Sequence, residues 1–187
     1  MRKIIVSEMI SVDAYFARTD GDIDWHIVDE DFMQYSIELL KTVDTVLFGR
    51  ITYQLFESYW PKAALDPATG PSDITIAHQL SEAKKIVFSK TLDHTDWNNV
   101  EVKKDILMAE IKALKESEGK DIVVYGSGTV VSTLAQFGLI DEYRLFVAPI
   151  VLGSGKSLFH HLSKVKLLET RQFANGNVLL RYQPEIV

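Results

Sequence analysis

Cysteine is absent from the 187-residue sequence, which excludes disulfides, zinc sites built on thiolates and cysteine nucleophiles. No stretch approaches the ~20 consecutive apolar residues that a membrane-spanning helix needs. Basic residues are too few for a protein that wraps nucleic acid, because 20 Lys and Arg face 26 Asp and Glu, giving a net charge of −6. The apolar segment before Ser7 is too short for a signal peptide. A cytoplasmic location is therefore the default expectation.

The composition is that of an ordinary globular protein, with 47% hydrophobic and 25% charged residues. Its length predicts a single domain over residues 1–187. The neighbouring histidines His160 and His161 project apart on a helix or strand, and no carboxylate follows at ligand spacing, so no metal site is expected.

Apolar runs and helix-like patterns alternate along the first 150 or so residues. The expected strands cover 3–9, 43–48, 85–88, 122–125 and 142–149, with a short one near 100–102, and the expected helices cover 29–42, 51–59, 73–82, 106–115 and 129–137. Pro61 is expected to end the second helix. Segments 167–173 and 177–182 flank Asn175-Gly176, which favours a tight hairpin turn. The sequence therefore predicts an α/β fold with a mostly parallel mixed sheet and a C-terminal antiparallel hairpin.

Three of the apolar runs end in small or basic residues just before a helix. Segment 46–48 is followed by Gly49-Arg50, segment 86–88 by Ser89-Lys90, and segment 122–125 by Gly126-Ser127-Gly128-Thr129. A helix that starts at such a turn presents unpaired N–H groups and the positive end of its dipole to an anion. Each turn alone is also compatible with a simple tight connection, since a short Gly-x-Gly is common. Three in one chain predict a phosphorylated cofactor lying across the ends of the sheet.

Particular residues at these turns are candidates for cofactor contacts. We expect amides of the 126–129 turn to bind a pyrophosphate and Gly49 to allow its close approach. Arg50, Thr52, Ser89 and Lys90 are expected around phosphate oxygens, including a ribose 2′-phosphate. No acid follows either turn to bind a free ribose hydroxyl, so NADPH is preferred over NADH.

The motifs at 48–53 (Phe-Gly-Arg-Ile-Thr-Tyr), 87–92 and 124–128 resemble the dihydrofolate reductase-like fold, a three-layer α/β/α architecture. The segment 138–153, and Ser11-Val12-Asp13 followed by Tyr15-Phe16-Ala17, are most similar to the reductase domain of the bifunctional riboflavin-biosynthesis deaminase-reductase. The chain departs from that pattern at Ala14, where the branch usually has glycine, and it has no deaminase half. The resemblance implies a stand-alone relative and a homodimer.

Three residues are candidates for work on the substrate. Asp13 matches the loop aspartate of the related reductases and is the candidate general acid or substrate anchor; the alternative is a solvated turn residue. Asp31 is a substrate contact by analogy with dihydrofolate reductases, although acids at helix starts are also favoured by the dipole. Lys156 is placed to meet a substrate phosphate, or else lies on a surface loop.

The sequence thus predicts an NADPH-dependent reductase of a small heterocyclic or imine-like substrate. By resemblance, its reaction is closest to that of 5-amino-6-(5-phosphoribosylamino)uracil reductase. The alternative is a protein of the same fold that binds a nucleotide cofactor or ligand without turnover.

Overall fold

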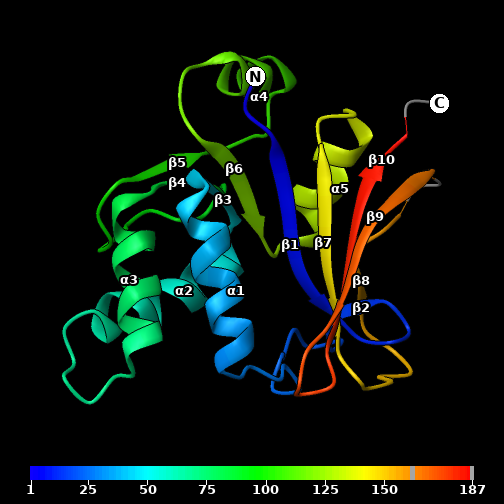
Figure 1. Cartoon of the computed structure of the whole chain (residues 1–187). Helices are drawn as coiled ribbons and strands as arrows, with labels where there is room; N and C mark the ends of the chain where they lie inside the picture. The colour runs from blue at the N-terminus through cyan, green and yellow to red at the C-terminus, as the bar shows by residue number, and fades with distance from the viewer. Residues whose placement is uncertain (161–162, 186–187) are drawn as a thin grey trace.

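The computed structural model describes residues 1–160 and 163–185, so His161 lies outside the described residues. It contains an eight-stranded mixed sheet (Figure 1). From one edge to the other the strands are β5 (Val100–Lys103), β4 (Lys84–Phe88), β3 (Val43–Gly49), β6 (Asp121–Tyr125), β1 (Ile4–Ile10), β7 (Glu142–Val147), β10 (Val178–Pro184) and β9 (Val165–Gln172). Neighbouring strands from β5 to β7 are parallel.

The C-terminal hairpin completes the sheet. Strand β10 is antiparallel to both β7 and β9. In the turn, Gly176 has φ +93° and its N–H donates to the Phe173 carbonyl, a backbone conformation that glycine adopts without steric cost. The predicted mixed sheet and its antiparallel hairpin are therefore confirmed.

Helices cover both faces of the sheet. They are α1 (Glu30–Lys41), α2 (Arg50–Ala63), α3 (Pro71–Glu82), α4 (Met108–Glu116) and α5 (Gly128–Gln136). Ile37 of α1 and Leu80 of α3 belong to one buried cluster with Ile5 of β1. Ile111 of α4 and Leu134 of α5 belong to another, which includes alternate residues of the same central strand. Since successive side chains of a strand point to opposite faces, the two clusters form the two interfaces of a three-layer α/β/α fold. None of the helices in the described part of the chain has the length and hydrophobicity needed to cross a bilayer.

A second, small sheet lies beside the ends of β1 and β7. Strand β2 (Tyr15–Ala17) pairs antiparallel with β8 (Lys156–Ser157). The sequence predicted an irregular loop here, which is wrong for residues 15–17. The pairing depends on a partner far along the chain, so local polarity gave no signal of it.

Helix α2 continues past Pro61, contrary to the expectation that it would end near Tyr59. Pro61 falls in the last turn, where its fixed φ is compatible with a helix and only one backbone hydrogen bond is lost. Phe56 and Trp60 pack against the buried cluster, and this tertiary packing holds the final turn in place.

Ala14 occupies a left-handed backbone conformation, with φ +65°. Its N–H donates to the Ser11 carbonyl at 2.9 Å in the turn between β1 and β2. Because Cβ is disfavoured in this region, Ala14→Gly should raise the free energy of unfolding by about 1 kcal/mol in urea denaturation. The exposed helical Ala109 is the matched control, and its change to glycine should lower stability by a similar amount. A loss of stability in both variants would contradict the conformation of Ala14.

Candidate active site

A cleft of about 1110 Å³ opens at the carboxyl ends of four neighbouring strands. Its floor includes Glu8 of β1, Gly49 after β3, Phe88 at the end of β4 and Tyr125 at the end of β6. The carboxyl ends of parallel strands are the usual ligand-binding edge of such a sheet. The cleft therefore brings together the three turns that the sequence singled out. The prediction that each of them starts a helix is wrong for Ser89-Lys90, because β4 is followed by a loop and then by β5.

Two of these turns interlock. A Cβ on Gly49 would collide with the side chain of Ser127, and a Cβ on Gly126 would lie 2.5 Å from the Thr52 hydroxyl oxygen. Gly126 also has φ +60°. Both glycines thus make room for side chains of this same chain, which packs the β3–α2 turn against the β6–α5 turn.

The interlocked turns bring two helix starts to the cleft. At α2, the N-cap Gly49 offers no side-chain hydrogen bond to the first amides. At α5, the Ser127 hydroxyl accepts from the Val130 N–H at 3.4 Å, while helix geometry leaves the Gly128 and Thr129 amides without an intrahelical acceptor. Gly128, Thr129 and Thr52 all line the cleft. The arrangement suits a phosphate group.

Positive charge gathers at one end of the cleft. Arg50 is exposed and donates to the Gln54 side chain at 3.0 Å, and in the described residues it has no ion pair with a carboxylate. Lys90 pairs with Asp105 at 3.1 Å. Asp105, an acid that the sequence did not single out, reaches this end because β5 lies beside β4. Arg50 therefore carries a charge that remains free for an anion, as does Lys104, which also lines the cleft and has no ion pair in the described residues.

Ser89 also lines this end of the cleft. Its hydroxyl oxygen accepts from the amides of Thr91 and Leu92, which leaves the hydroxyl proton available to an acceptor in the cleft.

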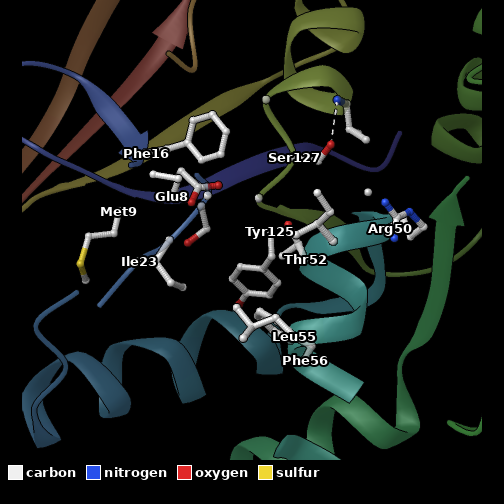
Figure 2. Close-up of a pocket in the computed structure, with 18 of the residues that line it drawn as sticks. Glu8, Met9, Phe16, Ile23, Arg50, Thr52, Leu55, Phe56, Tyr125 and Ser127 are labelled. Atoms are coloured by element: carbon white, nitrogen blue, oxygen red, sulfur yellow. Dashed lines mark hydrogen bonds between the residues drawn. The ribbon is translucent and has the colours of Figure 1, made fainter. Parts of the chain in front are cut away.

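One wall of the cleft is apolar and includes several aromatic rings. Helices α1, α2 and α3 contribute Phe32, Met33, Leu40, Leu55, Phe56, Trp60 and Ile76. Figure 2 shows Leu55 and Phe56 beside Tyr125, with Arg50 at one end of the view and Met9 and Ile23 at the opposite end. The cleft is thus charged at one end and hydrophobic along the rest, a combination suited to a flat ring held next to a phosphate-bearing group.

Glu8 is the site residue that sequence reasoning missed. It lies in the middle of β1, is only 8% exposed, and lines the cleft. Its Oε2 has no hydrogen-bond partner among the described residues. Burial raises the pKa of Glu8 to about 8, opposed by hydrogen bonds from the backbone of Gly126 and Met9. The available signal was an acid inside a central strand that is apolar apart from Ser7 and this acid.

The three predicted substrate residues lie in different places. Asp13 does not line the cleft; its carboxylate accepts from the amides of Leu152 and Gly153 at 3.1 and 2.7 Å. The pKa of Asp13 is lowered mainly by a hydrogen bond from the Ser11 side chain, and also by the hydrogen bonds from these two amides. Asp31 is also outside the cleft lining and pairs with Arg171. Lys156 does line the cleft.

The interlock between the two turns can be tested by a double-mutant cycle. Gly49→Ala should lower the free energy of unfolding by about 1–3 kcal/mol, because the new methyl group overpacks against Ser127. Ser127→Gly should restore most of that loss, since it removes the colliding atoms and suits the φ of +65° at this position. Urea denaturation of the four proteins measures the coupling; strictly additive effects would contradict the interlock.

The comparisons with known proteins agree with this geometry. The model of the RibD C-terminal domain family matches residues 2–179. The uncharacterized protein YyaP of Bacillus subtilis is 35% identical over 184 residues, which is 97% of this chain and 94% of that protein.

Two solved structures share the fold. The Thermotoga maritima diaminohydroxyphosphoribosylaminopyrimidine deaminase/5-amino-6-(5-phosphoribosylamino)uracil reductase aligns with a TM-score of 0.65 and 18% identity, over 98% of this chain and 56% of that one. The dihydrofolate reductase of Enterococcus faecalis, complexed with NADP(H), aligns with a TM-score of 0.65 and 15% identity, over 98% and 97%. The fold is therefore the dihydrofolate reductase-like one. The family match over nearly the whole length shows that this chain belongs to the RibD C-terminal domain family.

Proposed function

We propose that this protein is an NADPH-dependent reductase of a small heterocyclic or imine-like substrate. Its reaction would be closest to that of 5-amino-6-(5-phosphoribosylamino)uracil reductase. The observation that carries the proposal is the interlock of the two glycine turns, which directs the starts of α2 and α5 and the free cation Arg50 into one cleft. The family supports an oxidoreductase of this kind.

The residues of the cleft fit the parts of NADPH. The open amides at Gly128 and Thr129 suit the pyrophosphate, and Arg50 with Ser89 suits the 2′-phosphate at the charged end. The pairing of Lys90 with Asp105 reduces the contribution of that lysine. The nicotinamide ring would then reach the middle of the cleft, and would supply a hydride to the substrate.

The remaining part of the cleft suits the substrate. The aromatic wall formed by α1 and α2 favours a flat ring. Lys156, on the side of the cleft formed by β8, would meet a phosphate or another anionic group on the substrate. Asp13 and Asp31 have no part in this proposal, because neither lines the cleft.

The competing function is binding of a nucleotide without turnover. It shares the cofactor site, so it predicts the same affinity for NADPH. The two are separated by whether bound NADPH is oxidised when pyrimidine or pteridine compounds are added.

Arg50→Ala tests the cofactor preference. The wild type should bind NADPH more tightly than NADH in a titration that follows nicotinamide fluorescence. Losing a charge-assisted bond to the 2′-phosphate should weaken NADPH binding about 10–100-fold and NADH binding less than about threefold, since NADH lacks that group.

Arg18→Ala is the matched control, because Arg18 is a partly exposed arginine that pairs with Asp24 and does not line the cleft. Its affinity for both cofactors should be unchanged. An equal loss for NADPH and NADH in Arg50→Ala would remove the 2′-phosphate role. Failure of the wild type to bind either cofactor would overturn the proposed function.

We also propose that the protein is a homodimer that pairs through the C-terminal strands. Strand β9 is an edge strand and all of its residues are exposed, including Val165, Leu167 and Leu168. Exposed apolar edge strands favour association. Sedimentation should give twice the monomer mass for the wild type, and mainly the monomer for Leu168→Lys. A monomeric wild type would contradict the proposal.

A further inference from the structure

Glu8 is a buried acid with no counter-charge. No arginine, lysine or histidine forms an ion pair with it in the part of the chain that the structure describes, and Oε2 has no hydrogen-bond partner there. An ionised carboxylate buried in this way is strongly disfavoured. The carboxyl group is therefore held protonated at neutral pH, consistent with a pKa raised by burial.

Glu8 lies where its proton can reach a substrate bound in the middle of the cleft. Its neighbour Ser7 pairs with Tyr125 of β6 on one side, and Glu8 itself pairs with Leu145 of β7 on the other, so Glu8 is fixed in the centre of the sheet. In Figure 2 its carboxyl group lies beside the Phe16 ring and the turn that carries Ser127, between Arg50 at one end and Met9 at the other. A cofactor with its phosphates at Arg50 would extend toward Glu8.

We propose that Glu8 is the catalytic acid, which protonates the substrate atom that gains the electron pair during reduction. This inference rests on the proposed function for the hydride donor. In the step, the carbon of a substrate C=N group receives a hydride, the π electrons move to nitrogen, and nitrogen takes the Glu8 proton. The products are the amine, the oxidised cofactor and the Glu8 carboxylate, which regains a proton from water.

His26 is a weaker candidate for this role. It lines the same cleft, and burial lowers its pKa to about 4, so the ring is neutral. The ring donates to the backbone carbonyl of Phe16, which leaves the unpartnered Nε2 as the nitrogen without a proton. A neutral ring in this tautomer can accept a proton but cannot donate one into the cleft.

Tyr125 is the second alternative donor, since it is a phenol at the end of β6 in the cleft and burial raises its pKa. The other charged groups that line the cleft are Arg50, Lys90, Lys104, Lys156, Asp22, Asp73 and Asp105. None of them forms an ion pair or a hydrogen bond with Glu8 among the described residues. The titration of Glu8 should therefore be set by its burial.

The first test needs no cofactor and no turnover. The side-chain carboxyl carbon of Glu8, assigned in ¹³C-labelled wild-type protein, should titrate near pH 8 and should shift when NADPH is added. A titration near the ordinary glutamate value of about 4.3 would overturn the proposal. The proposal would also be overturned if NADPH binds and the ¹³C signal of Glu8 does not shift. If NADPH does not bind at all, the proposed function fails and the catalytic role fails with it, but a high pKa would still establish the protonated acid.

The second test compares two probes with the same ring system, of which one needs a proton for its reduction and the other does not. The cyclic imine 3,4-dihydroisoquinoline needs both hydride and proton, whereas its N-methyl iminium ion needs the hydride alone. Glu8→Gln should slow imine reduction at least about 100-fold and iminium reduction less than about threefold, with NADPH affinity retained. The wild-type imine rate should fall above pH 8 or so as Glu8 ionises.

Tyr125→Phe is the control variant and should leave the ratio of the two rates within about threefold of the wild type. Equal slowing of both probes by Glu8→Gln would show a structural role and overturn the proposal. Selective loss of imine reduction in Tyr125→Phe, with Glu8→Gln unaffected, would assign the proton to Tyr125. If neither probe is reduced, the first test decides between the outcomes: a shift of the Glu8 signal on addition of NADPH supports the proposal, and no shift overturns it.

Discussion

The packing of one strand-to-helix turn into another is the constraint on which the site depends. A Cβ at position 49 would collide with the side chain of Ser127, and a Cβ at position 126 would collide with that of Thr52, so both positions require glycine. Any larger residue at either glycine would push α2 and α5 apart. Because the turns fit together, the two helices start at the same cleft, and their dipoles and open amides act on one ligand. The strand order β3-β6-β1 then places the acid of β1 directly beside them.

The cleft separates charge from hydrophobic surface. The cation Arg50 and the open helix amides lie at the turns after β3 and β6, whereas the aromatic side chains of the wall are supplied by α1 and α2. A phosphate-bearing cofactor would bind at the charged end of the cleft, and a flat substrate would bind against the apolar wall. Glu8 is buried at the floor of the same cleft, beside Phe16 and the turn that carries Ser127, and this burial favours the protonated carboxyl group.

The fold was predictable from the sequence because its signals are local and consistent. Apolar runs closed by glycine or serine mark the parallel strands, and Asn175-Gly176 marks the hairpin. The pairing of β2 with β8 and the extension of α2 through Pro61 were not predictable, because both depend on contacts with distant residues.

Within the site, the glycine turns could be predicted from the sequence, but the packing contacts that require glycine there could not. The sequence predicted that Gly49 allows close approach of a phosphate, and the structure adds that a Cβ at Gly49 or Gly126 would collide with the side chain of Ser127 or Thr52. Glu8 lies in a strand whose other residues, apart from Ser7, are apolar, and only the folded structure shows that it lines the cleft. A crystal structure of the complex with NADP⁺ tests the account most directly. We expect the pyrophosphate at the 126–129 turn, the 2′-phosphate at Arg50 and the nicotinamide next to Glu8; a cofactor bound elsewhere, or with its nicotinamide at Arg50, would contradict it.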